Sequence, residues 1–227
     1  MCYLNQSDLL PGKADMQRFY PILIIILAGV FWACAGGNSA QKRPPHLSDG
    51  ITALTKGIAR YDKGCYQQAL EYFFRAHELF SASDQLSGVA MSLNNIGNVY
   101  RIIADTESAL LFFDESLSIY EGLGDQQGVV QVLSNKAAAL IDGGQMEAAA
   151  DVLNTAEGLA QKNSISYGPL LSNRGILFIK KKDYQQAKKI LETALAKADP
   201  ANVSEFATAN FAYGTFMLAT ESYENAV

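Results

Sequence analysis

The sequence is poor in the residues that build metal sites, disulfide frameworks and nucleic-acid interfaces. Its 227 residues include two histidines and three cysteines, too few for a metal cluster or a cysteine-rich scaffold. Charged residues make up 18% of the chain and the formal net charge is −5, which argues against a protein that binds nucleic acid phosphates. Glycine and proline are not in excess, so we do not expect wholesale disorder. These absences favour a folded protein that interacts with other proteins.

Motifs typical of enzymes are also missing. Gly122, Gly124 and Gly128 form a glycine-rich stretch, but their spacing does not match a nucleotide-binding loop and no expected strand precedes them. His46 lies in a polar stretch and His77 on an expected helix, and neither has a cysteine or a second histidine at ligand spacing. No nucleophile paired with a general base is identifiable. We therefore expect no catalytic activity, no cofactor and no metal site.

One long apolar run stands near the N-terminus. Residues 19–37 (FYPILIIILAGVFWACAGG) carry no charge and follow Arg18. Their densest part, residues 20–33, has about the length of a signal-peptide hydrophobic region and is short for a membrane span. We expect translation to begin at Met16, and residues 1–33 to comprise an upstream extension followed by a signal peptide or membrane anchor.

The end of this run resembles a bacterial lipoprotein signal, because the small residue Ala33 precedes Cys34 and small, flexible residues follow it. The resemblance implies that Cys34 is lipidated and becomes the mature N-terminus, although Phe31 and Trp32 are bulkier than the family pattern. An uncleaved membrane anchor and ordinary secretion are the alternatives. Each places the rest of a bacterial chain outside the cytoplasm, and a lipid or membrane anchor would hold it in the cell envelope. We expect residues 34–49 to form a flexible tether between the membrane and the domain.

The rest of the chain repeats one pattern with a period close to 40 residues. Small residues recur at intervals of 40, 40, 38 and 39 residues: Gly57, Gly97, Ala137, Gly175 and Gly214. An alanine follows each of them twelve positions later: Ala69, Ala109, Ala149, Ala187 and Ala226. Four positions after the first four alanines stand large apolar residues: Phe73, Phe113, Leu153 and Leu191. A repeat of this length indicates a stack of similar supersecondary units.

The spacing within one unit predicts a pair of antiparallel helices joined by a short turn. Leu93, Ile96, Gly97 and Tyr100 follow an i, i+3, i+4, i+7 rhythm, which is typical of a helix with one apolar face. A helical glycine costs about 1 kcal/mol relative to alanine, so its recurrence indicates that two helices cross closely there. One pair cannot bury its own apolar face, and we therefore expect neighbouring pairs to stack into a solenoid.

These columns resemble the tetratricopeptide repeat, and the string from Ile96 to Tyr100 (IGNVY) matches its pattern best. The resemblance covers about residues 51–227. It implies an all-α, right-handed superhelix in residues 50–227, with four full repeats and a truncated fifth, and a concave groove that binds a protein or peptide. The fifth repeat stops at Val227, about one turn into its expected second helix. We interpret the sequence as a fragment of a longer chain, or as a chain whose last helix is short.

A polar column on the expected first helices supplies candidate binding residues: Asn95, Asn135 and Asn173. At about 100° per residue, this column points away from the apolar stripe, toward the side that forms the groove in the family. Each carboxamide can pair with a peptide backbone, and the resemblance supports such a ladder in long-period repeats. Asn98 and Arg101 lie near the same face and are further candidates. The alternative is that the asparagines are solvated, or bond a neighbouring helix and align the repeats.

Charge is distributed unevenly along the repeats. Residues 105–157 are mainly acidic, whereas residues 174–197 are mainly basic. Such an asymmetry can steer a partner or a lipid head group, or it can mark a solvated edge. We interpret the chain as a membrane-tethered scaffold that binds a protein or peptide in its groove during the assembly of envelope complexes. The alternative is that it forms the N-terminal sensory or docking part of a longer signalling or catalytic protein.

Overall fold

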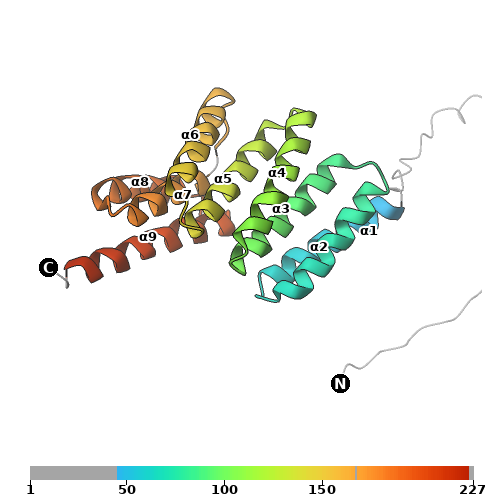
Figure 1. Ribbon diagram of the computed structural model, residues 1–227, viewed down its shortest axis with the longest axis horizontal. Helices are drawn as coiled ribbons and strands as arrows, with labels where there is room; N and C mark the ends of the chain where they lie inside the picture. Colours follow the sequence, from blue (N-terminus) through green and yellow to red (C-terminus); the bar gives the residue numbers. More distant parts are fainter. Residues whose placement is uncertain (1–44, 167, 225–227) are drawn as a thin grey trace, which may run out of the picture. The chain divides into compact units, whose positions relative to one another are not determined.

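The computed structural model describes residues 45–166 and 168–224 (Figure 1). Every regular element in this part of the chain is an α-helix, which confirms the all-α prediction. The predicted signal peptide and lipidation site, and most of the predicted tether, lie outside the described residues. Helix α1 (Pro45–Tyr61) begins within the segment 34–49, for which the sequence predicts a flexible tether. Proline is favoured at the start of a helix, where its missing N–H has no helical acceptor, so helical structure begins earlier than predicted.

The helices alternate between the first and second helices of consecutive repeats. The first helices are α1, α3 (Leu86–Ile102), α5 (Gln126–Asp142), α7 (Gly168–Lys180) and α9 (Val203–Glu224). The second helices are α2 (Tyr66–Ser81), α4 (Thr106–Leu123), α6 (Met146–Lys162) and α8 (Tyr184–Lys197). Each of α1, α3, α5 and α7 packs antiparallel to the helix that follows it, and successive pairs stack along the chain (Figure 1). The described residues form an α-solenoid, as the repeat predicts.

The turns share a local conformation that recurs in register with the repeat. Most turns contain one residue with a positive φ angle: Gly64, Ala104, Gly144 and Lys182 within repeats, and Asp84, Gly124 and Ser164 between them. Aspartates cap several of the helices that follow. Asp105 accepts a 3.1 Å hydrogen bond from the Ser108 backbone N–H, and hydrogen bonds from Ser108 lower the pKa of this carboxyl. Asp125 and Asp183 cap α5 and α8 in the same way, so each cap satisfies an N–H that the helix leaves unpaired.

The recurring small residues lie where the two helices of a repeat cross. A Cβ atom on Gly57 would stand 2.5 Å from the ring of Phe73, and one on Gly97 would stand 2.7 Å from the ring of Phe113. Both rings are fully buried. A larger residue at either position would displace the ring. Glycine therefore permits the two helices to approach closely, and the packing gained offsets its conformational cost. The close helix crossing that the sequence predicts is therefore confirmed.

A second set of glycines lies at the joints between repeats and has no counterpart in the predictions. Gly88 on α3 lies against the ring of Phe80 at the end of α2, and Gly128 on α5 lies against the ring of Tyr120 at the end of α4. Both rings are buried, and burial raises the pKa of Tyr120 above its ordinary value. At the third joint the corresponding residue of α6 is Ala160. The joints between repeats are therefore not equivalent.

The fifth repeat differs from its predicted form. The register predicts a turn before Tyr223 and a second helix that begins there, but α9 continues without a break to Glu224. The preceding stretch, residues 215–222 (TFMLATES), contains no glycine, proline or asparagine to end the helix. Among the described residues no second helix follows α9 in its own repeat, and nothing lies within 4 Å of a Cβ added to Gly214. The predicted turn is therefore wrong, and Ala226 lies outside the described residues.

Residues 43–227 form one compact unit. The unit buries its own apolar clusters, one contributed mainly by α1–α3 and a larger one contributed mainly by α4–α6. A domain with its own core can fold without its neighbours, so residues 43–227 are a suitable unit for experiments. None of the described helices combines the length and the apolar character that a membrane crossing requires.

Candidate functional site

Two of the predicted asparagines join neighbouring repeats. The side-chain nitrogen of Asn135 on α5 donates a hydrogen bond to Oδ1 of Asn94 on α3 at 3.0 Å. The side-chain nitrogen of Asn173 on α7 donates to the carbonyl oxygen of Ser134 at 2.9 Å and to its hydroxyl at 3.0 Å. Asn173 is almost entirely buried. Both side chains make the inter-helix hydrogen bonds that the stacking alternative predicts, and these bonds align α3, α5 and α7.

The two predicted asparagines on α3, Asn95 and Asn98, have other surroundings. Asn95 donates a 2.8 Å hydrogen bond back to the carbonyl oxygen of Met91 on its own helix. Asn98 is half-buried, and its side chain makes no hydrogen bond with the described residues. Neither carboxamide bonds to a neighbouring repeat, so both keep hydrogen-bonding capacity for another molecule. The polar column is therefore not a uniform ladder.

Arg101 connects three first helices. Its Nη1 atom forms a 2.8 Å ion pair with Oδ2 of Asp142 on α5. On the opposite side it lies beside Tyr61 of α1, where burial raises the pKa of the tyrosine and the guanidinium partly offsets that rise. The Nε atom of Arg101 is buried and has no hydrogen-bond partner among the described residues. Arg101 therefore links the repeats while one of its donors stays unpaired.

A hollow of about 210 Å³ opens beside this cluster, on the side that the first helices form. It is lined by Arg101, Ala138, Ile141, Asp142, Asn173, Ile176, Lys180, Phe211 and Thr215. These residues come from α3, α5, α7 and α9, and no second helix contributes to the lining. The hollow therefore lies on the side of the first helices, to which the sequence resemblance assigns the groove.

The structure brings two of the five predicted site residues to this hollow. Arg101 and Asn173 line it, whereas Asn95, Asn98 and Asn135 do not. The three outside the lining lie on α3 and α5, the same first helices that supply part of the wall. The predicted residues therefore lie on the first helices, two of them at the hollow, and their role in binding stays a prediction.

The sequence analysis missed the apolar wall and the second cation of the hollow. Ile176 on α7 and Thr215 on α9 each stand one position after the small residue of their repeat, in the same column as Asn98. That column was a usable signal, since its members in the last three repeats, Ala138, Ile176 and Thr215, all line the hollow. Phe211 and Lys180 lie outside both of these columns, and no repeat signal marks them.

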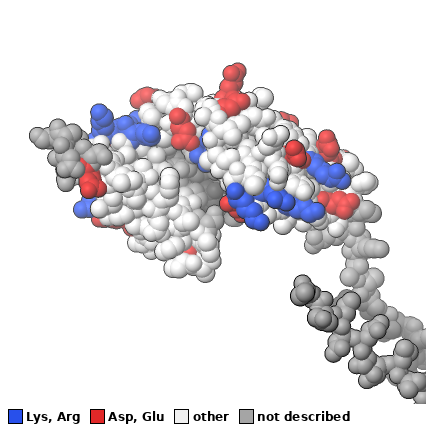
Figure 2. Space-filling model, turned by 90° about the horizontal axis from the view of Figure 1, so that it is seen from below, with Lys and Arg blue, Asp and Glu red and all other residues white. Residues whose placement is uncertain are grey.

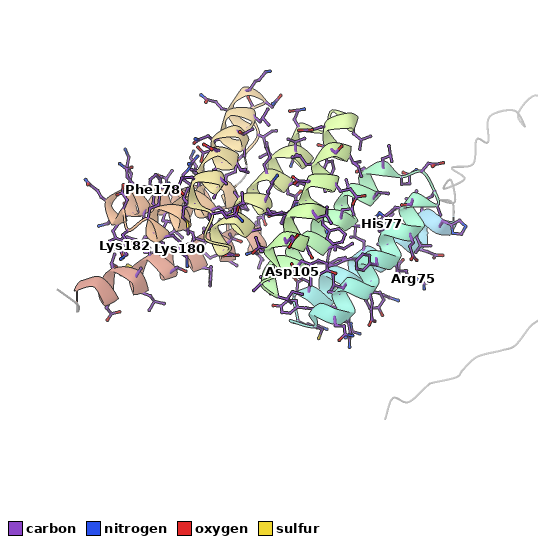
Figure 3. All side chains as sticks on the ribbon, viewed as in Figure 1. Arg75, His77, Asp105, Phe178, Lys180 and Lys182 are labelled. Carbon is purple, nitrogen blue, oxygen red and sulfur yellow. The ribbon has the colours of Figure 1, made fainter. Side chains whose placement is uncertain are left out.

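The hollow combines two cations, of which Arg101 is paired with Asp142, with an uncovered apolar surface. Phe211 is 71% exposed despite its aromatic ring. Lys180 lies at the C-terminal end of α7, close to Lys182 in the turn that follows (Figure 3). Cations beside an apolar wall suit an extended segment that carries a carboxylate next to an apolar side chain. In the part of the chain that the structure describes, no group of His, Cys, Asp or Glu side chains is arranged to hold a metal ion.

The acidic stretch of the sequence and the basic stretch that follows it meet at the joint between the third and fourth repeats. Arg174 on α7 forms a two-pronged ion pair with Glu157 on α6, with both N–O distances at 2.9 Å, and also donates to Asn154 at 2.8 Å. Lys181 lies 3.6 Å from Glu147. The basic stretch of the fourth repeat is thus partly paired with acidic side chains of the third.

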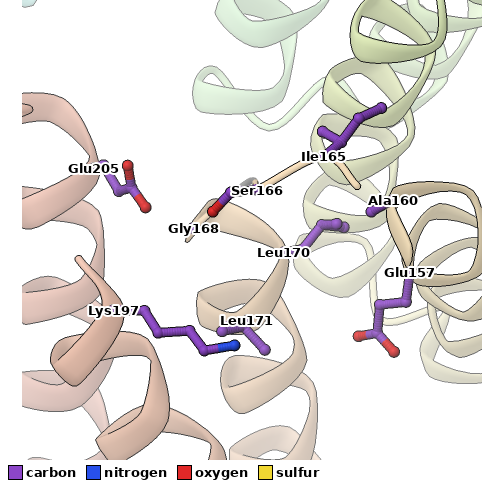
Figure 4. Close-up of a pocket in the computed structure, with 9 residues that line it drawn as sticks. All are labelled: Glu157, Ala160, Ile165, Ser166, Gly168, Leu170, Leu171, Lys197 and Glu205. Atoms are coloured by element: carbon purple, nitrogen blue, oxygen red, sulfur yellow. The ribbon is translucent and has the colours of Figure 1, made fainter. Parts of the chain in front are cut away.

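A second hollow, of about 240 Å³, lies at the same joint (Figure 4). Ala160 of α6 and Leu170 of α7 form part of its apolar lining, and Lys197 and Glu205 stand near its rim. Ala160 occupies the register position that Phe80 and Tyr120 fill with a ring at the two preceding joints. The space remains because a methyl group stands where those joints have an aromatic side chain.

Comparison with known families identifies the repeat. Residues 50–122 match a model of the tetratricopeptide repeat, and residues 169–199 match a second model of the same repeat. Both segments are therefore tetratricopeptide repeats. The repeat formed by α5 and α6 falls between the two matches, yet its helices have the same order and register as those of its neighbours.

Several solved structures share the arrangement of these tetratricopeptide repeats. A Rap protein complexed with competence and sporulation factor is 21% identical, with a TM-score of 0.65 over 80% of this chain and 54% of that one. Aspartyl phosphate phosphatase F from Bacillus subtilis is 14% identical, with a TM-score of 0.63 over 80% of this chain and 48% of that one. A putative kinesin light chain from Podosopora anserina with nearly identical TPR-like repeats is 16% identical, with a TM-score of 0.54 over 80% and 94%.

The chain therefore spans about half the length of the first two proteins. At these sequence identities, the structural similarity shows a shared fold only. A search of curated proteins finds no match.

Proposed function

We propose that this protein is a non-catalytic scaffold that captures an extended segment of a partner protein in the groove lined by its first helices. The observation that carries the proposal is the hollow where Arg101 and Lys180 stand beside the exposed ring of Phe211. A carboxylate on the partner segment would pair with the cations, and a neighbouring apolar side chain would pack on the ring. The partner is therefore a protein or peptide segment with acidic and apolar residues close together.

The asparagines have two roles in this proposal. Asn135 and Asn173 hold the first helices in line through hydrogen bonds between repeats. Asn95 and Asn98 extend the polar surface along α3 and offer donors and acceptors to the partner's backbone. The Rap protein structure, which is complexed with competence and sporulation factor, supports a partner of this general kind for the present chain.

The proposal is tested by selecting peptides from a phage-displayed random library on residues 43–227 and measuring their affinities by fluorescence anisotropy. We expect enriched peptides to contain an acidic residue beside an apolar one. Phe211→Ala and Lys180→Glu should each weaken binding by about tenfold or more, which corresponds to about 1.4 kcal/mol. Both side chains are exposed, so these changes should leave the fold intact, as circular dichroism can verify.

A matched control is Leu111→Ala, which removes an equally exposed apolar side chain from the second helix α4. Its affinity for the selected peptides should stay within about twofold of the unmodified protein. Equal losses in the Phe211 and Leu111 variants, or a library that yields no enriched peptide, would contradict the assignment of the groove.

We further propose that the scaffold is tethered to a membrane in a bacterial cell envelope, where it serves the assembly of envelope complexes. The support is the apolar run at residues 19–37 and the lipoprotein-like sequence at Cys34. Intact mass spectrometry of the membrane fraction from a Gram-negative host tests this proposal. A mature chain that begins at Cys34 with added acyl mass is the expected result. An uncleaved chain in the membrane would replace the lipid tether by an anchor, and a chain found only in soluble fractions would contradict tethering.

A further inference from the structure

The hollow at the third joint has room for a small molecule and shares no lining residue with the hollow of the first helices. Four residues form its apolar part: Ala160 of α6, Ile165 of the following turn, and Leu170 and Leu171 of α7. Its volume of about 240 Å³ exceeds the roughly 150 Å³ of an apolar cavity that binds benzene. It is smaller than the sites of drug-sized ligands, which begin at about 300 Å³. The hollow therefore fits one aromatic ring with a few polar atoms attached.

Lys197 supplies a positive charge at the rim of this hollow. It is the last residue of α8, and its side chain points toward the hollow (Figure 4). Among the residues that the structure describes, Lys197 forms no ion pair. Glu157 also lines the hollow, but its carboxylate is held by Arg174 in the two-pronged ion pair. The ammonium group of Lys197 is therefore free to pair with a carboxylate of another molecule. Figure 2 shows how Lys and Arg side chains are distributed over one face of the molecule.

Glu205 supplies a negative charge at the same rim. Its Oε2 atom accepts a 3.2 Å hydrogen bond from the side-chain nitrogen of Asn202. Its Oε1 atom lies so close to Gly168 that a Cβ atom added there would collide with it. The missing side chain at Gly168 therefore lets the carboxylate reach the hollow. In the described part of the chain no cation forms an ion pair with Glu205, so the carboxylate is free to pair with an ammonium group of another molecule.

We propose that this hollow binds a free α-amino acid with an aromatic side chain. The carboxylate of the ligand pairs with Lys197, its ammonium group pairs with Glu205, and its ring occupies the space beside Ala160. At the two preceding joints the chain fills the same register position with its own ring, Phe80 or Tyr120. An α-amino acid is a small molecule that carries an anion, a cation and an apolar group together, as this lining requires. A ligand of this size makes few contacts, so we expect a Kd on the order of 0.1–1 mM.

Titration of residues 43–227 with L-phenylalanine, followed by two-dimensional NMR, tests the proposal. The amide signals of Ile165 and Leu170 should shift and saturate. Phenylacetate lacks the ammonium group and phenethylamine lacks the carboxylate, so each should bind at least about fivefold more weakly. Glycine lacks the ring and should show no saturation. Equal affinities of the three aromatic compounds, or a titration with L-phenylalanine that does not saturate, would overturn the proposal.

Substitutions test the assigned residues. Lys197→Met should weaken the binding of L-phenylalanine by at least about fivefold. The matched control is Lys188→Met, which removes an exposed lysine of the same helix outside the lining and should leave the affinity within about twofold. Ala160→Phe fills the space and should abolish saturable binding. Equal affinities of the two lysine variants would overturn the proposal. Tyr167 lies outside the described residues; if only a Tyr167→Ala variant binds L-phenylalanine, the occupant is the chain's own ring and the proposal is wrong.

Discussion

The joints between the first three repeats differ from the joint between the third and fourth. At the first two joints a ring at the end of a second helix packs on a glycine of the next first helix, Phe80 on Gly88 and Tyr120 on Gly128. At the third joint Ala160 replaces the ring, and a hollow of about 240 Å³ remains. Repeats with the same helix order can therefore be joined by different kinds of packing.

The length of the repeat accounts for part of this difference. The interval between small residues falls from 40 to 38 residues at the third joint, and α7 has 13 residues where α3 and α5 each have 17. Helix α7 lacks the first helical turn of α3 and α5, and that turn carries the glycine at the joint, Gly88 or Gly128. Polar contacts act in its place, namely the ion pair of Arg174 with Glu157 and the hydrogen bonds of Asn173 with Ser134.

The largest expected effect comes from removing a ring from a tight joint. Tyr120 is 5% exposed and lies against Gly128. Tyr120→Ala should lower the free energy of unfolding by about 3–5 kcal/mol, because it leaves a cavity at the joint between the second and third repeats. Urea denaturation followed by circular dichroism measures the loss. A loss below about 1 kcal/mol would mean that the ring does not hold the joint.

An added methyl group at the same joint should also destabilise the protein. A Cβ on Gly128 would collide with the ring of Tyr120, so Gly128→Ala should cost about 1–3 kcal/mol through overpacking. Gly158→Ala on α6 is the matched control, since that site is open. It should stabilise the protein by about 0.5–1 kcal/mol through helix propensity. Effects of the same sign on the denaturation midpoint would contradict the close approach at Gly128.

Filling the third joint should sharpen the comparison in the opposite direction. Ala160→Phe supplies the ring that this joint lacks and should raise the free energy of unfolding by about 1 kcal/mol, part of the value of a fully buried ring. The same change at Ala156, which is fully buried in a filled part of the core, should destabilise the protein through overpacking. Thermal denaturation of the two variants measures both changes in stability. A destabilised Ala160 variant would show that the hollow cannot accommodate a ring.

The smallest expected effect concerns the polar contacts at the third joint. Arg174→Lys keeps the charge but removes the two-pronged geometry with Glu157, and should cost about 0.5–1 kcal/mol. Because charge contributes at this joint, the unmodified protein should lose more stability there at high salt than at the first two joints. Hydrogen exchange of α6 and α7 amides at low and high salt measures this difference. Exchange that is independent of salt would indicate that apolar contacts alone hold the joint.

Much of the fold was predictable because its signals are local and recur. Gly97, Ala109 and Phe113 belong to one repeat, and their spacing reappears along the chain, so their helix pairing could be inferred without knowing any distant contact. The joint pair Tyr120 and Gly128 connects different repeats, and the pattern fails at the third joint. The unbroken α9 was also missed, because a helix end depends on the partner helix as well as on register.

The candidate site was predictable only in part, for a related reason. Asn173 belongs to the polar column of the first helices, which is visible in the sequence, and Arg101 lies near the same face; both line the hollow. Phe211 was missed, since the exposure of an aromatic ring depends on how four helices are arranged around a hollow. The partners of Asn135 and Asn173 are on the preceding repeat, and the sequence left that outcome open as one of two alternatives.

Amide hydrogen exchange of residues 43–227, with and without a peptide selected from the library, tests the central claim most directly. The account predicts slower exchange in α5, α7 and α9, with the largest change in the segments that carry Asn173 and Phe211. Protection confined to the second helices α4, α6 and α8 would contradict binding in the groove of the first helices.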